Sequence, residues 1–473
     1  MSKLGSSIAT ASFIRIIGQL ITWGFSLAIV RFLKPWDYGI IAIAMATYGL
    51  FVSVLDWTAQ QLLIRARDCS VEYEREISGI TAWGAVCAIL ILVLASAITF
   101  AVYKSADLAV ALLGISPFLI LNVIKVVPES RAARNGLVGR QSFAILLEAI
   151  INVTTAWILV HFFADFRALL IGAFCGLLLR TCVLLNSTGG VLPEFRFSSL
   201  APHKKEFFSV GSGEVVPQMT SIAPVYLMGL TLGKANLGFV TTAQHLVSMP
   251  ASRIMVILNQ VLLPHFSKLN ETSESVDLRN AVTKAAVNLV WLTLPMFIGM
   301  ALVSHDLVLV VFGKNWLGMQ WLLAVLAVVM PIKMIRDFLI NPLRAMRLDR
   351  MVLEINLIAF CLTILAVSAG FFVAFDIFAV LLASAIGLAS IFGIYKSIQS
   401  LKLPLADFVA VIKPVLSTLL MAFVCVALMQ RLASSEPLIR LVVVSLSGAM
   451  TILVCAVVNF RASLLSLLRA RFG

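Results

Sequence analysis

Long apolar runs separated by short polar connections extend from one end of the chain to the other. A helix needs about 20 mostly apolar residues to cross a bilayer. By this criterion the pattern predicts an all-α polytopic membrane protein with about fourteen transmembrane helices. The predicted spans are 8–30, 38–64, 79–102, 108–124, 142–163, 168–188, 207–231, 238–263, 285–304, 318–341, 352–373, 376–395, 406–429 and 438–459.

An internal repeat accompanies these spans. The connection "RFLKPWDYGIIAIA" (31–44) follows the first span, and "LTLGKANLGFVTTA" (230–243) follows the seventh. A constant offset of 199 residues aligns Asp37 with Asn236 and Gly39 with Gly238. The same offset pairs Gln19 with Gln218, Gln61 with Gln260, and Arg15 with Glu214. Parallel repeats of this kind are a transporter architecture. We therefore expect two six-helix lobes followed by two extra C-terminal helices.

The pattern also predicts limits for these parts. They are an N-lobe (1–190), a cytoplasmic linker (191–206), a C-lobe (207–400), spans thirteen and fourteen (401–460) and a basic cytoplasmic tail (461–473). The tail either lies along the inner membrane surface or is a frayed basic end.

Composition supports a membrane protein. Hydrophobic residues make up 61% of the chain and charged residues 12%, whereas soluble domains are near 25% charged. The seven cysteines include no CxxC pair, so we expect neither disulfides nor a metal site. The first apolar run does not resemble a cleaved signal peptide. The net charge of +13 reflects basic cytoplasmic loops rather than nucleic-acid binding.

Lysine and arginine in the connections predict the orientation. With the N-terminus inside, the cytoplasmic segments carry 22 of these residues and the external segments carry 8. We therefore expect both termini to be cytoplasmic.

The first connection, "RFLKPWDYG" from Arg31 to Gly39, is the most specific motif. Together with the span number, the internal termini, the repeat and the basic loops after even-numbered spans, it resembles the MOP exporter superfamily. Within that superfamily the chain is similar to the polysaccharide-transporter branch of Wzx-like flippases. The resemblance covers the whole chain in topology, and its residue-level similarity is concentrated in 10–65.

This resemblance implies a V-shaped pair of helical bundles around a central cavity. Members of the branch move a lipid-linked oligosaccharide from the inner to the outer leaflet, commonly coupled to an ion gradient. It also implies a bacterial cytoplasmic (inner) membrane location and no cofactor. The implied partners are the lipid-linked oligosaccharide, membrane lipids and other polysaccharide assembly proteins, but no nucleic acid.

Charged residues inside the predicted spans lie mostly in the cytoplasmic half of their helices. Such residues face a bundle interior or a wet cavity rather than lipid. A cavity lined by guanidinium groups would attract a phosphate from the cytoplasm. The expected substrate-binding residues are Arg15, Gln19, Gln61, Arg180, Gln218, Arg253, Gln260, Lys333 and Arg336; the expected ion-coupling residues are Asp56, Glu148, Glu214 and Asp337.

A structural explanation of the same charges stays open, because acids and bases balance and could form buried ion pairs between helices. Arg15 with Glu214 is one such pair. The functional alternatives are a MATE-like multidrug antiporter, a lipid II flippase, and a membrane-embedded polysaccharide polymerase or ligase. The sequence offers no nucleophile–base pair, metal-ligand spacing or phosphate-binding glycine loop, so we expect a transporter rather than an enzyme.

Overall fold

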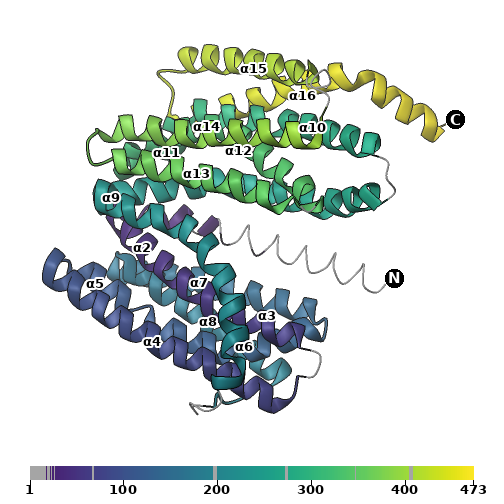
Figure 1. Ribbon diagram of the computed structural model, residues 1–473. Helices are drawn as coiled ribbons and strands as arrows, with labels where there is room; N and C mark the ends of the chain where they lie inside the picture. The colour runs from purple at the N-terminus through teal and green to yellow at the C-terminus, as the bar shows by residue number, and fades with distance from the viewer. Residues whose placement is uncertain are drawn as a thin grey trace. The chain divides into compact units, whose positions relative to one another are not determined.

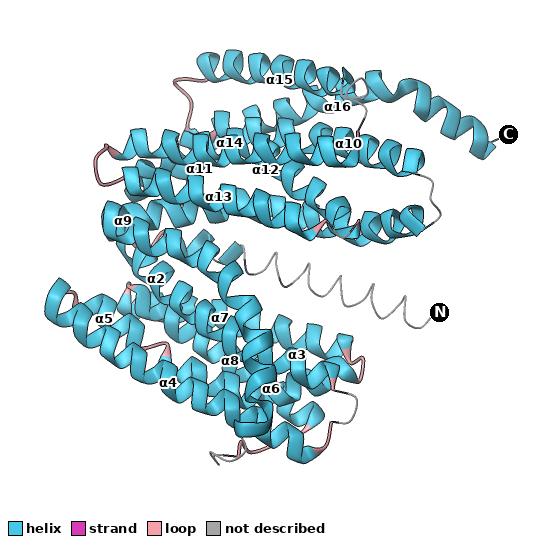
Figure 2. Ribbon diagram, viewed as in Figure 1, coloured by secondary structure: helices cyan, strands magenta, loops and turns pink. Residues whose placement is uncertain are grey.

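The computed structural model describes residues 18, 22, 24–25, 27–66, 69–194, 200–271, 275–346, 348–403 and 409–472. Some side chains, chiefly in 200–217, 257–278 and 460–472, lie outside this description. Helices joined by short connections account for nearly all of these residues, and no strand occurs among them (Figures 1 and 2). The predicted all-helical fold class is confirmed.

The chain divides into two compact units, Met1–Gly238 (unit 1) and Phe239–Gly473 (unit 2). The predicted lobe limits, 1–190 and 207–400, stay a prediction. The helices of unit 1 before the long helix α9 are α2 (Pro35–Val52), η1 (Ser53–Trp57), α3 (Thr58–Arg65), α4 (Val71–Tyr103), α5 (Ala106–Leu113), α6 (Ser116–Arg134), α7 (Val138–Phe163) and α8 (Phe166–Thr188).

Helix α9 (Leu200–Glu271) starts in unit 1 and continues into unit 2. The remaining helices of unit 2 are α10 (Ser275–Leu302), α11 (Ser304–Val311), η3 (Lys314–Met319), α12 (Gln320–Ala345), α13 (Asp349–Ala369), α14 (Phe375–Leu401), α15 (Ile412–Arg431) and α16 (Pro437–Phe472). Helices α15 and α16 pack on α10, and an apolar cavity of about 680 Å³ lies among the three.

The backbone of α9 breaks at Gly233, whose φ of 75° is left-handed and open to glycine at little cost. This break falls between the predicted seventh and eighth spans, so α9 is two helices joined by a tight connection. A Cβ atom on Gly39 would collide with the carbonyl oxygen of Lys234, and one on Gly238 with that of Pro35. Because the 199-residue offset also relates Pro35 to Lys234, the two repeated connections contact each other through equivalent positions.

The second predicted span consists of α2, η1 and α3 in direct succession. Pro35 occupies the first turn of α2, where its missing N–H costs nothing. The Asp37 carboxylate accepts a hydrogen bond from the Lys34 backbone N–H at 3.0 Å, which fixes the start of the helix. One turn of π-helix, Ser53–Trp57, then interrupts the α-helical spacing. Such single turns are rare and frequently occur at functional sites.

The fourth predicted span, 108–124, differs from the structure inside the span and at its C-terminal end. The helix is interrupted between α5 and α6, and α6 then continues through Pro128 to Arg134. A proline inside a membrane helix is tolerated where neighbouring groups compensate. The Thr188 hydroxyl of α8 donates to the Pro128 carbonyl oxygen at 3.1 Å and so joins α8 to α6 beside the proline. Residues 125–134, expected as a cytoplasmic connection, therefore belong to the helix.

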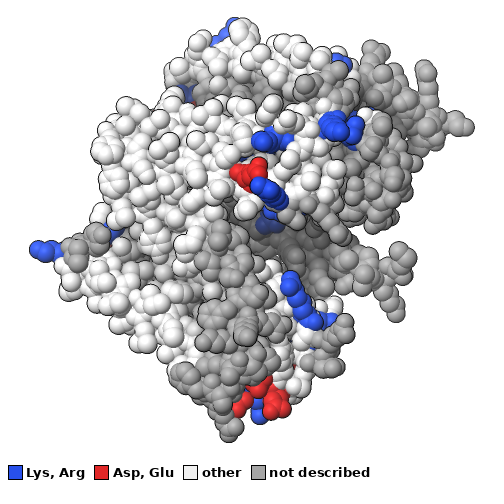
Figure 3. Space-filling view, viewed as in Figure 1, with Lys and Arg blue, Asp and Glu red and all other residues white. Residues whose placement is uncertain are grey.

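Large apolar side chains are exposed on the outer faces of the helices, as Leu90 and Leu94 on α4 and Phe423 on α15 illustrate. Charged side chains form only small groups on the face seen in Figure 3, which is otherwise mostly uncharged where it is described. Ten helices in the described part of the chain are long and apolar enough to cross a membrane. An extensive apolar exterior needs a lipid environment, so the chain is a multi-pass membrane protein.

Candidate functional site: a buried ionic network in unit 1

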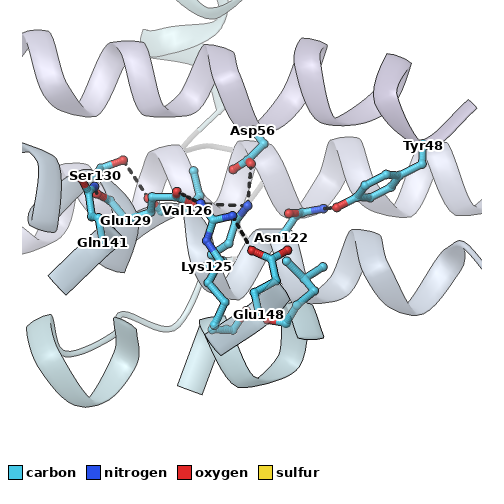
Figure 4. A network of polar contacts seen from close by, with 12 residues as sticks. Tyr48, Asp56, Asn122, Lys125, Val126, Glu129, Ser130, Gln141 and Glu148 are labelled. Atoms are coloured by element: carbon cyan, nitrogen blue, oxygen red, sulfur yellow. Dashed lines mark hydrogen bonds and ion pairs between the residues drawn. The ribbon is translucent and has the colours of Figure 1, made fainter. Parts of the chain in front are cut away.

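Five charged side chains form a connected network inside unit 1. Lys125 on α6 places its Nζ 3.2 Å from Asp56 Oδ2 of η1 and 3.3 Å from Glu129 Oε2, one turn along the same helix. Arg180 on α8 donates to Glu148 Oε2 of α7 at 2.9 Å and also to Glu129 Oε1. Figure 4 shows the carboxylates of Asp56, Glu129 and Glu148 converging around Lys125. The network therefore ties four elements together.

The network is deeply buried and its charges do not balance. The side chains of Asp56 and Lys125 are only 5% and 7% exposed. Burying a charge is costly unless a partner compensates it. Each cation bridges two carboxylates, so three acids share two bases, and the network carries one surplus negative charge when every group is ionised.

Close packing of α7 and α8 positions the Arg180–Glu148 pair. Gly172, Gly176 and Arg180 follow one another at four-residue intervals, so they lie on one face of α8. A Cβ atom on Gly176 would lie 2.6 Å from the backbone oxygen of Glu148, and one on Gly172 at the same distance from that of Asn152. Small residues at this spacing allow helix backbones to approach closely in membranes. The glycines therefore bring Arg180 within reach of Glu148.

A second ion pair lies farther along α6. Arg131 binds Glu74 of α4 through two hydrogen bonds, at 2.9 and 2.5 Å, and donates to the Thr188 carbonyl oxygen at 3.0 Å. Arg134 donates to the Leu63 carbonyl oxygen. Arg131 and Glu74 neutralise each other, and the Arg134 side chain is exposed, so neither arginine compensates the network.

In unit 2, α12 carries a cluster of opposite sign. Asp337 accepts from Lys333 Nζ at 2.6 Å and from Arg336 Nη2 at 2.6 Å. Two bases share one carboxylate, which leaves one surplus positive charge. Gly393 of α14 makes room for this cluster, since a Cβ atom there would lie 2.7 Å from Arg336 Cγ.

Asp306 of α11 forms a further pair near the end of α10. Its side chain is 1% exposed and accepts two hydrogen bonds from Arg440 of α16. His305 lies 3.1 Å away. Burial opposes ionisation of Asp306, but the hydrogen bonds from Arg440 and His305 prevail and hold its pKa below the usual range.

The structure gathers some of the predicted site residues into two clusters. Asp56, Glu148 and Arg180, predicted in two separate roles, belong to one network, and Lys333, Arg336 and Asp337 form the α12 cluster. Gln61, Gln218 and Arg253 are half-buried in other places. Arg15, Gln19 and the side chains of Glu214 and Gln260 lie outside the described residues.

Sequence reasoning missed two members of the network, Lys125 and Glu129. The predicted end of the span at 124 places Lys125 in a cytoplasmic connection. The signal that could have identified them is their i,i+4 spacing, which places a base and an acid on one helical face.

Comparison with known proteins agrees with this architecture. A family described as "Polysaccharide biosynthesis protein" matches residues 28–320. The Teichuronic acid biosynthesis protein TuaB of Bacillus subtilis is 31% identical over 161 residues, which cover 31% of this chain and only 32% of that protein.

Two solved structures share the fold at low sequence identity. The Lipid II flippase MurJ in an inward closed conformation aligns with a TM-score of 0.76 and 15% identity, over 97% of this chain and 99% of that one. An inward-facing multidrug resistance MATE family transporter of the MOP superfamily aligns with a TM-score of 0.63 and 12% identity, over 82% and 98% of the two chains. The chain therefore belongs to the polysaccharide biosynthesis protein family and has the fold of MOP superfamily transporters.

Proposed function

We propose that this protein is a flippase that moves a polyprenyl-pyrophosphate-linked polysaccharide repeat unit from the inner to the outer leaflet. Family membership supports a role in polysaccharide biosynthesis, and the fold is that of transporters. The observation that carries the proposal is the surplus positive charge of the α12 cluster, because a pyrophosphate is the part of such a substrate that a buried cation would recognise.

Lys333 and Arg336 are the proposed phosphate-binding residues. Asp337 fixes both cations, so a positioning role suits it better than the ion-coupling role expected from sequence. Arg336 offers the planar guanidinium that matches phosphate oxygens, and Lys333 adds a more exposed ammonium. Gln61, Gln218 and Arg253 are proposed as further contacts to the substrate, as are Arg15, Gln19 and Gln260 outside the described side chains.

Arg180 is reassigned within this proposal. Its guanidinium binds both Glu129 and Glu148, which favours a structural role in the unit 1 network over contact with substrate. Glu148, and likewise Glu214, keep the proposed role in ion coupling.

The proposed orientation has both termini in the cytoplasm of a bacterial cell whose inner membrane holds the protein. It rests on the excess of Lys and Arg in the connections assigned to the inside. A single cysteine near Lys104 should react with an impermeant thiol reagent from outside, and one near Arg134 should not. The opposite labelling pattern would reverse the orientation.

A multidrug antiporter is the second candidate, because the matched MATE family transporter shares the fold. Cationic drugs need carboxylates in the binding site, whereas a lipid-linked pyrophosphate needs bases. Transport assays with both substrate types therefore separate the two functions.

The direct test uses purified protein in proteoliposomes with a fluorescent polyprenyl-pyrophosphate oligosaccharide. Hydrogen bonds to charged groups contribute about 1.5–3 kcal/mol each, so Lys333→Gln with Arg336→Gln should slow flipping at least about tenfold. Adding Asp337→Asn to this double variant removes the carboxylate that would otherwise remain without a cation. The triple variant therefore tests loss of substrate binding without leaving an unpaired charge that could impair folding. Arg350→Gln is the matched control, because the Arg350 side chain is 93% exposed. Normal flipping by the neutral triple variant would remove the α12 cluster from the mechanism.

A further inference from the structure

The unit 1 network lacks one positive charge, and its described neighbours do not supply it. When every group is ionised, Asp56, Glu129 and Glu148 carry three negative charges, and Lys125 and Arg180 carry two positive ones. A buried cluster with an uncompensated charge is strongly unfavourable in a low-dielectric interior. One more positive charge would make the network neutral.

The other bases near the network are already engaged. Arg131 on α6 is committed to Glu74 of α4, and Arg134 donates to a backbone oxygen. Tyr48 on α2 is uncharged and accepts from Asn122 at 2.7 Å. Among the side chains that the structure describes, no further base reaches the three carboxylates. The described part of the chain therefore leaves one negative charge of the network uncompensated.

The three carboxylates differ in how well they are compensated. Glu129 receives both Lys125 and Arg180. Glu148 shares Arg180 and, at 26% exposed, is the least buried of the three. Asp56 shares Lys125, is 5% exposed, and its Oδ1 has no hydrogen-bond partner among the described residues. Asp56 is consequently the carboxylate least able to remain charged.

We propose that the network binds one proton and that the proton resides on Oδ1 of Asp56. The proton is taken up from the pool of solvent protons, forms the O–H bond of a neutral carboxylic acid on the Asp56 carboxylate, and leaves Lys125 and Arg180 balanced by Glu129 and Glu148. Proton binding by Asp56 is a property of the folded protein. The role of this proton as the coupling ion rests on the proposed transport function.

A proton suits this position better than a metal ion. Lys125 Nζ already occupies the cation position 3.2 Å from Asp56 Oδ2, so a sodium ion at the same carboxylate would meet an ammonium at close range. The oxygen of Asn122 that lacks a partner lies on the same helix as Lys125, one turn away, and gives too small a ligand set for a cage. A proton needs only the free oxygen of Asp56.

Infrared difference spectroscopy counts protonated carboxyl groups directly, because a carboxylic acid absorbs apart from the amide bands and shifts in deuterium oxide. In purified protein at neutral pH, the spectrum of the native chain minus that of Asp56→Asn should contain one such band. Lys125→Met should gain a second acid band, because three carboxylates then share one base. Combining Lys125→Met with Asp56→Asn should return the count to one.

Glu354→Gln is the matched control, because it removes a half-exposed carboxylate from a membrane helix of unit 2 and should leave the band unchanged. If Lys125→Met does not fold, the Asp56→Asn difference alone decides the matter, since the asparagine mimics the neutral acid. A native chain without an acid band assigned to Asp56 would overturn the proposal. A second outcome would also overturn the proposal. If sodium chloride raises the melting temperature of the native protein, choline chloride does not, and the effect disappears in Asp56→Asn, then the site binds a metal ion.

The infrared measurement and the flipping assay can refute the proton site and the proposed substrate independently of each other. A protein that shows the Asp56 band but does not move the fluorescent lipid retains the proton site and refutes the proposed substrate. A protein that moves the lipid without the band keeps its function and loses this proton.

Discussion

Replacing Arg180 with methionine distinguishes a structural cation from a substrate contact. The guanidinium bridges Glu129 and Glu148, and methionine retains the length of the side chain but neither hydrogen bond. If Arg180 mainly holds the network together, its loss should destabilise unit 1 strongly. If it mainly binds substrate, the protein should stay stable and lose transport.

The magnitude follows from burial. Removing one partner of a buried ion pair typically costs about 3–5 kcal/mol, because the other charge remains without compensation. Two carboxylates lose a partner here, but Glu129 keeps Lys125 and Glu148 is partly exposed, so we expect the same range of about 3–5 kcal/mol. For a domain of 150–250 residues, each kcal/mol corresponds to about 2–4 °C, so the melting temperature should fall by roughly 10 °C.

The assay is thermal unfolding of purified protein in detergent, followed by fluorescence, at several pH values. The difference in melting temperature between Arg180→Met and the native protein should become smaller as pH falls, since protons then neutralise the carboxylates that have lost their partner. Adding Glu148→Gln should recover part of the stability in a double-mutant cycle. Arg167→Met serves as the control, because Arg167 lies on the same helix with a half-exposed ion pair. An Arg180→Met protein that melts with the native protein would refute the structural role.

Two further predictions concern helix packing and pH. Gly176→Leu should lower stability by about 1–3 kcal/mol, because the new side chain must displace the Glu148 backbone, whereas Gly139→Ala, which meets nothing within 4 Å, should be neutral in the same melting assay. Because the pKa of Asp306 is lower in the folded protein than in the unfolded chain, where it is about 3.9, ionised Asp306 stabilises the fold above that pH. This contribution is lost as pH falls below about 4. The native protein should therefore lose melting temperature more steeply than Asp306→Asn in this range, and parallel curves would show that the bond to Arg440 adds no pH dependence.

Hydropathy and turn residues predicted the helical membrane fold because both signals are local. The break in α9 fell where the sequence placed it, since Gly233 allows a backbone conformation that other residues resist. Hydropathy failed at α6, where Pro128 and the charges beyond it resembled the end of a span. Those charges are satisfied by residues distant in sequence, such as Glu74 for Arg131, and a window along the chain cannot register such partners.

The candidate site was predicted residue by residue but not as an arrangement. Asp56, Glu148 and Arg180 stood out because charges inside apolar runs are conspicuous. Their connection depends on Lys125, which bridges two elements, and on the glycines of α8, which set a distance between backbones. Neither property is visible in the composition of a single span.

Gly172 and Gly176 of α8 also affect how the helices of unit 1 can move. Two helices whose backbones touch have few side chains between them that could slide or repack, so α7 and α8 should move as one rigid rod. The π-helical turn at Ser53–Trp57 lies across the network from that rod and interrupts the regular hydrogen-bond spacing of its own helix. Asp56 is thus carried by the compliant element and Arg180 by the stiff one, so that motion in unit 1 would change their separation while the rod itself keeps its shape.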